Sequence, residues 1–213
     1  MSTTDLRAFV SALLEAHPDG ILPLVQLGQP VLRAEAADYE GQLGDLLPDF
    51  LHALHMTMLD APGVGVAAPQ VGVPLKIAVM RDPGTDNPED TRERMAFEYR
   101  VIINPRYEPV GEREVSFYEG CLSFEGYQGV VARAHQVRLL ATDETGEQVD
   151  EVLTGWPARI AQHETDHLYG TVYVDKAETR SLSSTDNLVA LWSQSTDPDA
   201  AASALDFPVA QRA

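Results

Sequence analysis

The chain has 213 residues, of which 44% are hydrophobic, and this is enough to build one substantial core. Its formal charge of -18 at pH 7 argues against direct binding of nucleic acid, because such binding uses clustered Lys and Arg. No stretch is apolar for long enough to form a membrane helix, and the N-terminal segment lacks the pattern of a signal peptide. We therefore expect one globular, cytoplasmic domain that contacts neither nucleic acid nor membranes.

The predicted elements change in kind along the chain. Apolar residues at helical spacing predict one helix over residues 4–16 and another over residues 43–60. Over residues 73–153, short runs rich in Val, Ile, Tyr and Leu alternate with turn residues, which is typical of antiparallel strands. The polar interval 81–95 favours an exposed loop without function, and a further helix is predicted over residues 157–170. This order indicates an α+β fold.

The composition also suggests three segments. Residues 1–20 form an N-terminal helical extension, and residues 21–180 hold the strands, the helices and the motifs described below. Residues 181–213 are rich in Ser, Ala and Asp, so we expect an acidic C-terminal tail that is partly disordered.

Two histidines lie one helical turn apart in the sequence QHETDHL, which covers residues 162–168. On a helix, His163 and His167 share one face, so both imidazoles can reach one metal ion. Glu164 follows the first histidine directly and can act as a general base on a water molecule at that ion. Asp166 is expected to orient a ligand or to brace the helix against Arg133, and bracing is the favoured role. The motif predicts a metal-dependent hydrolase.

The third ligand separates the classes of metal hydrolase that use this motif. The further histidine of the metzincin pattern is replaced by Tyr173, and no glutamate follows Glu178 to complete a thermolysin-like site. The remaining soft donor is Cys121, the single cysteine, in the sequence EGCLS. A thiolate and two imidazoles leave the fourth tetrahedral position open to water, as hydrolysis requires. A zinc peptidase, a cysteine nucleophile and a metal-binding module without activity stay open as alternatives.

A glycine-rich segment, GVGVAAPQ, covers residues 63–70, and Gly63 and Gly65 permit another backbone to approach closely. This segment, EGCLS and QHETDH occur in the order and approximate spacing of the three signature motifs of the peptide deformylase family. The chain resembles this family over about residues 21–178. The resemblance implies antiparallel β-sheets wrapped around a central helix that carries the His-Glu-x-x-His motif. It also implies a hydrolase that removes the N-formyl group from the N-terminal methionine of nascent polypeptides and releases formate.

The resemblance assigns a role to individual residues of the catalytic centre. The three metal ligands are the sulfur and imidazole donors already described, Cys121, His163 and His167. The acid/base is Glu164, and the oxyanion is stabilised by the side chain of Gln70 together with the backbone N–H of Leu122.

The substrate-binding residues follow in part from the same resemblance. Gly65 matches a backbone contact to an extended substrate peptide. Val64, Tyr127 and Ile160 are candidates for the apolar pocket that receives the methionine side chain, although each is equally compatible with the ordinary core. Gln128 stands close to the position where some members carry an arginine, so we expect that contact to be absent.

The cofactor and partners are also expectations from the resemblance. Bacterial members of the family typically use Fe²⁺, which we therefore favour, while Zn²⁺, Ni²⁺ or Co²⁺ also suit one thiolate and two imidazoles. Relatives that dock on the ribosome use a basic C-terminal helix, whereas this tail holds four aspartates against the single Arg212. The expected partners are N-formylmethionyl nascent peptides, with transient proximity to the ribosome at most.

Overall fold

The larger sheet is antiparallel throughout and has the strand order β1-β2-β3-β6-β7 in this computed structural model, which describes residues 3–61 and 63–210. Its strands are β1 (Gly65–Ala67), β2 (Ile77–Asp82), β3 (Phe97–Pro109), β6 (Gln136–Thr142) and β7 (Gln148–Thr154). In the central pair, Ile77 lies opposite Ile103 and Val79 lies opposite Val101.

The two faces of this sheet bury alternate side chains of β2, because successive residues of a strand point to opposite sides. Ile77 and Val79 pack into the cluster that contains the apolar side of α2 (Leu47–Asp60). Ala78 and Met80 pack into the cluster that contains Ile160 of α3 (Gly155–Leu168). The helix that carries the two histidines is therefore fixed to the inner face of the sheet.

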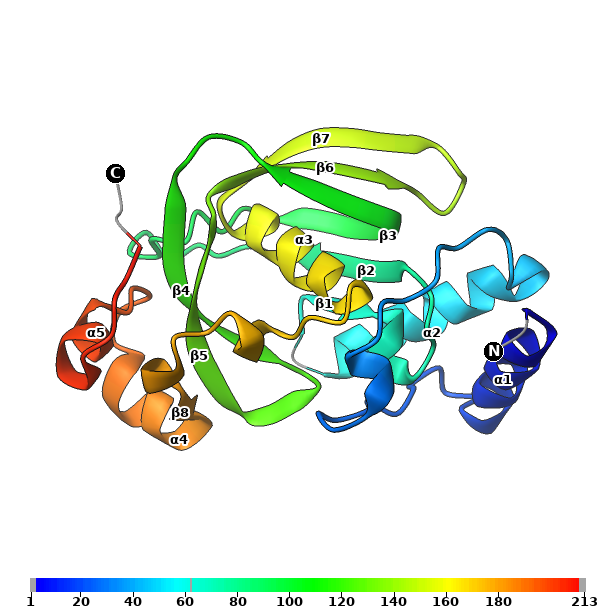
Figure 1. The fold of residues 1–213 in the computed structure, drawn as a ribbon, viewed down its shortest axis with the longest axis horizontal. Coiled ribbons are helices and arrows are strands. Elements are labelled where there is room, and N and C mark those ends of the chain that lie inside the picture. The colour runs from blue at the N-terminus through cyan, green and yellow to red at the C-terminus, as the bar shows by residue number, and fades with distance from the viewer. Residues whose placement is uncertain (1–2, 62, 211–213) are drawn as a thin grey trace.

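A second sheet covers the other side of α3. It consists of β4 (Glu114–Cys121), β5 (Phe124–Ala134) and the short β8 (Ser183–Ser184), in the order β4-β5-β8. The β4–β5 hairpin is long and curved, and Figure 1 shows α3 between this hairpin and the larger sheet. The predicted α+β arrangement of antiparallel sheets around a central helix is confirmed.

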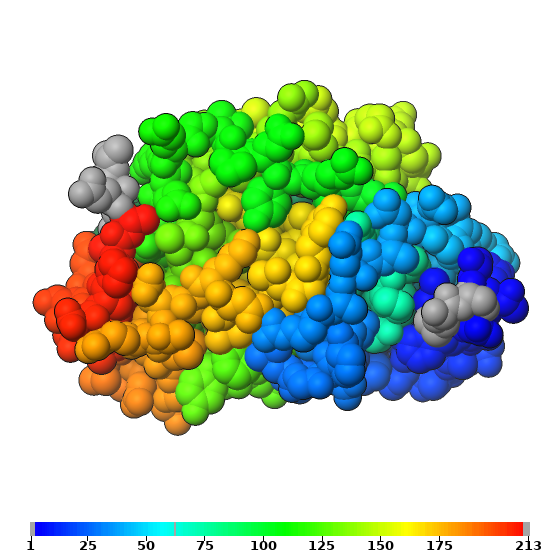
Figure 2. Space-filling view, in the orientation of Figure 1, coloured from blue at the N-terminus to red at the C-terminus, as the bar shows by residue number. Residues whose placement is uncertain are grey.

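The N-terminal extension and the C-terminal segment lie at opposite ends of the molecule (Figure 2). Helix α1 (Thr3–Ala16) packs on α2 through the buried Leu6 and Val10. The C-terminal segment contains α4 (Thr185–Asn187), a π-helical turn (Leu188–Trp192) and α5 (Asp199–Leu205). It packs against β5, where Phe207 joins the buried Val130, while partial disorder of the acidic tail stays a prediction.

Short 3₁₀ turns connect these elements. They are Pro30–Leu32, Gly44–Leu46, Ala68–Val71, Tyr173–Asp175 and Thr179–Ser181. Across the residues that the structure describes, no helix combines the length and the apolar character needed to cross a membrane.

The interval 81–95 is exposed over most of its length, as predicted, but part of it packs against the body of the protein. The first two residues belong to β2, and the rest returns to the body of the protein to reach β3. The side chain of Asp82 is fully buried and accepts two hydrogen bonds from Arg94 Nε and one from Arg94 Nη2. Arg92 and Arg94 line the same cavity as Cys121, so this interval contributes to the site described next.

Candidate metal centre and active site

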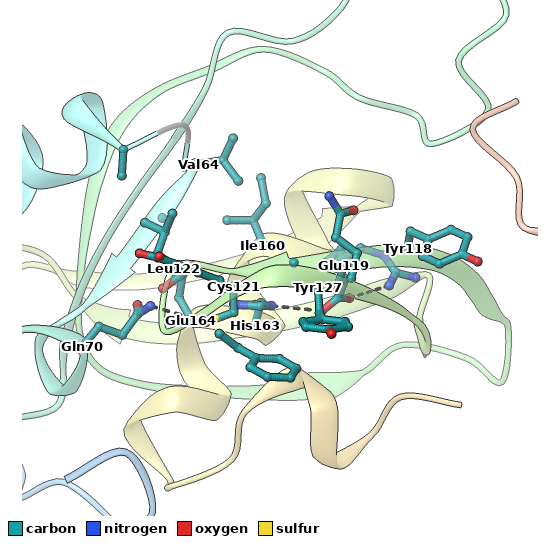
Figure 3. Close-up of a pocket in the computed structure, with 18 of the residues that line it drawn as sticks. Val64, Gln70, Tyr118, Glu119, Cys121, Leu122, Tyr127, Ile160, His163 and Glu164 are labelled. Atoms are coloured by element: carbon teal, nitrogen blue, oxygen red, sulfur yellow. Dashed lines mark hydrogen bonds and ion pairs between the residues drawn. The ribbon is translucent and has the colours of Figure 1, made fainter. Parts of the chain in front are cut away.

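Three donor side chains that are far apart in sequence meet at one point. Cys121 ends β4, beside an irregularity in its pairing with β5, and His163 and His167 lie on consecutive turns of α3. Their ligand atoms all lie within 4.8 Å of one another, and Cys121 Sγ is 3.2 Å from His167 Nε2. Figure 3 shows Cys121, His163 and Glu164 grouped between Gln70 on one side and Glu119 on the other.

This donor set fits a divalent metal ion. In a tetrahedral site with metal–sulfur and metal–nitrogen distances of about 2.3 and 2.1 Å, a sulfur and a nitrogen lie roughly 3.6 Å apart. The observed sulfur–nitrogen distance of 3.2 Å is close to this value. Burial and the neighbouring His163 hold the pKa of His167 well below its usual value, so its imidazole is neutral, as a metal ligand must be. The three residues therefore have the chemistry and the spacing of a metal centre.

Glu119 orients the first histidine. Its Oε2 lies 3.0 Å from His163 Nδ1, which leaves His163 Nε2 as the nitrogen available to a metal ion. Burial opposes a charge on His163, but hydrogen bonds to Cys121 and Glu119 raise its pKa to about 10. A metal ion that binds Nε2 must therefore displace a proton.

Two buried arginines keep Glu119 ionised. Arg133 donates to both of its carboxylate oxygens at 2.6 and 2.9 Å, and Arg159 donates to Oε1 at 2.5 Å. Burial alone would raise the pKa of Glu119, but the charges of Arg133 and Arg159 hold it well below its usual value. Arg133 also pairs with Asp166 at 2.7 Å, as predicted, so one buried network joins β4, β5 and α3 around the histidines.

Glu164 is the buried carboxylate of the site, with only 4% of its surface exposed. Its Oε2 has no hydrogen-bond partner within the described residues. Burial raises its pKa to about 7, so the group can both accept and release a proton near neutral pH. Gly65 lies against this carboxylate, because a Cβ atom built on Gly65 would overlap the Glu164 side chain. The glycine is therefore needed for space, since its φ is not in the left-handed region.

Gln70 presents its amide N–H groups to the sulfur side of the cluster. The backbone N–H of Ala67 donates to Gln70 Oε1 at 2.9 Å, which fixes the amide orientation. Gln70 Nε2 then lies 3.5 Å from Cys121 Sγ and 3.3 Å from Ser123 Oγ. Leu122 follows the cysteine directly, and its carbonyl accepts a hydrogen bond from Gln26 at 2.9 Å. Gln70 and the backbone of Leu122 thus flank Cys121.

The cluster opens into a cavity of about 830 Å³ that Val64, Gly65, Tyr127 and Ile160 all help to line. Val64 and Ile160 pack into one apolar cluster together with Trp156. Tyr127 lies apart from them in Figure 3; it is 49% exposed and stacks on Phe124. It therefore occupies the rim rather than the apolar end of the cavity.

Sequence reasoning missed several residues of the site. Glu119 precedes Cys121 by two positions on a strand, so alternation places both side chains on one face. Arg159 precedes His163 by four positions on a helix, which also places the two on one face. Both spacings could have identified Glu119 and Arg159 as neighbours of the metal ligands from the sequence. Trp156 precedes Ile160 by four positions on the same helix, so it had this signal too. Arg92 had none, because the fold of the interval 81–95 brings it to Trp156.

Comparison with known proteins agrees with this geometry. The family model described as polypeptide deformylase matches residues 21–182. Peptide deformylase 3 of Streptomyces avermitilis is 56% identical over 192 residues, which cover 88% of this chain and 85% of that protein. Peptide deformylase 1 of Streptomyces coelicolor is 55% identical over 191 residues, with 88% and 87% covered.

Solved structures give the same result. The Met-Ala-Ser-bound class I type b peptide deformylase of Acinetobacter baumannii is 33% identical with a TM-score of 0.66, and the match covers 73% of this chain and 98% of that chain. The actinonin complex of the Synechococcus elongatus enzyme is 34% identical with a TM-score of 0.63, with 74% and 79% covered. The chain therefore belongs to the polypeptide deformylase family.

Proposed function

We propose that this chain hydrolyses the N-formyl group of peptides that begin with formylmethionine, and that it does so in the cavity beside Cys121. The observation that carries the proposal is the convergence of one sulfur and two imidazoles next to a buried carboxylate with a pKa of about 7. Membership of the polypeptide deformylase family supports the class of reaction. The cluster of Cys121, His163 and His167 supports the choice of residues that perform it.

In this proposal, Cys121, His163 and His167 hold one divalent cation. The bound cation supplies a positive charge that polarises the formyl carbonyl and lowers the pKa of a water molecule. Glu164 accepts a proton from the attacking water and then delivers it to the departing amide nitrogen. A carboxyl group with a pKa near the working pH suits both steps.

Gln70 and the Leu122 N–H stabilise the negative charge that develops on the formyl oxygen. Gln70 suits this role because the Ala67 N–H already occupies its amide oxygen and leaves its donors directed toward the site. Removal of one such donor typically costs about 3 kcal/mol, or roughly a hundredfold in rate.

We further propose Fe²⁺ as the native metal. One thiolate and two imidazoles also accept Zn²⁺, Ni²⁺ or Co²⁺, so the support comes from the usage expected of bacterial family members. Metal analysis of protein purified without oxygen tests this choice. Iron at about one equivalent per chain supports it, and another metal at that ratio with no iron refutes it.

The proposed substrates are N-formylmethionyl nascent peptides, and we place the reaction in the cytoplasm, in transient proximity to the ribosome. The formal charge of -18 supports a reaction without direct contact to nucleic acid. Relatives named as peptide deformylases from two Streptomyces species support the substrate class.

The test of this function is a formate-release assay with formyl-Met-Ala-Ser, combined with mass analysis of the peptide products. The proposal predicts stoichiometric formate and intact Met-Ala-Ser. Cleavage of a peptide bond without release of formate would instead identify a peptidase. Glu164→Gln keeps the size of the side chain and should retain the metal while it loses at least about a hundredfold in kcat.

A further inference from the structure

We propose that Arg92 and Trp156 form a wall that limits the length of the substrate's first side chain, an inference that rests on the proposed function. Both residues line the cavity that also contains Cys121 and Glu164. Trp156 lies at the start of α3, and Arg92 belongs to the segment between β2 and β3. The interval predicted to be an exposed loop thus supplies one of the two residues of the wall, Arg92.

Trp156 belongs to the apolar lining of the cavity, and Arg92 lies against it. Val64, Ile160 and Trp156 belong to one packed cluster, so their side chains form a continuous apolar surface. The guanidinium of Arg92 lies over the Trp156 ring, 4.9 Å from the ring centroid. A cation held over an indole face at this distance is attracted to it. An apolar side chain bound along Val64 and Ile160 therefore lies next to a Trp156 ring that Arg92 covers.

Asp90 holds the guanidinium of Arg92 in place. Arg92 Nε and Nη2 donate to the two carboxylate oxygens of Asp90 at 2.8 and 2.6 Å, and the Asp90 side chain is only 2% exposed. The backbone N–H of Arg92 donates to the same carboxylate at 3.0 Å. Two parallel hydrogen bonds to a buried carboxylate fix the plane of the guanidinium. The wall is consequently stiffer than an ordinary surface arginine.

The segment that carries Arg92 is also attached to the start of α3. The Trp156 N–H is 3.4 Å from the Glu93 carbonyl oxygen, and the Glu93 carboxylate lies 2.9 Å from His135 Nε2. Gly155 has a φ of +66°, and a Cβ built there would lie 2.9 Å from the Glu93 carbonyl oxygen. Only glycine fits this approach, so the two halves of the wall are held against each other.

A third attachment comes from the C-terminal segment. The Thr91 N–H donates to Thr196 Oγ1 at 3.1 Å, and the two hydroxyl groups lie 2.9 Å apart. Thr185, at the start of α4, lines the cavity itself. The C-terminal segment therefore supports the residue next to Arg92.

Because the wall is held at three points, we expect it to select substrates by the length of their first side chain. In this proposal, a side chain the size of methionine ends before the wall, whereas a longer one displaces the Arg92–Trp156 pair or leaves part of its chain in water. Each methylene that a pocket accepts or rejects changes kcat/KM by about tenfold or more. Shortening Arg92 should extend the pocket and admit longer chains.

The experiment compares kcat/KM for formyl-Met-Ala-Ser with kcat/KM for formyl-2-aminodecanoyl-Ala-Ser. The native chain should prefer the methionine peptide by about tenfold or more, and Arg92→Ala should reduce this preference by about tenfold. Arg92→Lys keeps an aliphatic stem and a charge but loses the paired hydrogen bonds to Asp90, so its preference should fall between the two. Arg138→Ala is the matched control, because Arg138 forms a similar two-bond pair with Asp150 but does not line the cavity.

Binding of the same two peptides without the formyl group, measured by calorimetry, tests the wall independently of turnover. If formyl-Met-Ala-Ser releases no formate but Arg92→Ala shifts the binding preference, the proposed function fails and the wall stands. If formate is released and the preference of Arg92→Ala stays within twofold of the native value, the wall is wrong. Should Arg92→Ala not fold, Arg92→Lys decides, and an unchanged preference in that variant also overturns the inference.

Discussion

Glu119 and His163 are hydrogen-bonded at 3.0 Å, and this contact joins the strand that supplies the sulfur to the helix that supplies the imidazoles. Glu119 lies two residues before Cys121 on β4, so one short stretch of strand supplies a metal ligand and also orients a second ligand. The carboxylate is buried between Arg133 and Arg159, which balance its charge.

The first prediction concerns the stability that this network provides. Glu119→Ala removes the carboxylate that two buried guanidinium groups share, so the free energy of unfolding should fall by about 3 to 5 kcal/mol. Urea unfolding measures this loss. The control is Glu151→Ala, which breaks a partly exposed pair with Arg100 and should cost below about 1 kcal/mol. Equal costs for the two variants would contradict the structural role of Glu119.

The second prediction concerns metal affinity. Glu119→Gln keeps the shape of the side chain but removes the charge that orients His163, so metal affinity should fall by about 10- to 100-fold. Competition with a chelator of known affinity measures this change. Unaltered affinity in a folded variant would show that His163 does not need this partner.

The third prediction tests the space beside Glu164. Gly65→Ala adds a methyl group where the Glu164 carboxylate lies, so kcat should fall by about a hundredfold while the metal content stays unchanged. Adding Gly65→Ala to Glu164→Gln should lower kcat only slightly further, because the acid/base role of Glu164 is already lost in the single variant. Losses that multiply in the double variant would mean that the glycine acts through another group, such as the substrate backbone.

The fourth prediction concerns the dependence of stability on pH at the wall. The hydrogen bond from Arg92 holds the pKa of Asp90 below its usual value of 3.8. A lowered pKa in the folded state means that this stabilisation is present above about pH 4 and is lost as the pH falls through the folded-state pKa. Asp90→Asn should therefore lower the thermal unfolding temperature at pH 7, and the difference from the native chain should shrink toward pH 3. A difference that stays constant over this range would exclude the ion pair as its cause.

The sequence was most informative where structure is local. The spacing of His163 and His167 predicts their common face because helix periodicity is fixed, and the strand runs predict antiparallel sheets for a similar reason. Strand β1 was not predicted, since its three residues lie within a glycine-rich segment and pair only through contact with β2. The position of Arg92 could not be predicted either, because its neighbours Thr91 and Glu93 are held by Thr196 and Trp156, which are distant in sequence.

Predictions for the site depended in the same way on whether a residue's position follows from local structure. The contact of Cys121 with the two histidines was expected from the elimination of other donors and from the family resemblance, and the structure brings the three together. Tyr127, one of the candidates for the apolar pocket, lines the same cavity but is half exposed near the tip of the hairpin, and its role in binding methionine stays a prediction. Trp156 takes the place beside Val64 and Ile160.

The most direct test of the account is X-ray absorption at the metal edge of protein purified without oxygen, because every catalytic role depends on the shared donor set. We predict one sulfur scatterer at about 2.3 Å and two imidazole nitrogens at about 2.1 Å, with the sulfur absent in Cys121→Ser. A spectrum without sulfur in the native chain, or one that Cys121→Ser leaves unchanged, would contradict the proposal that Cys121, His163 and His167 hold one ion.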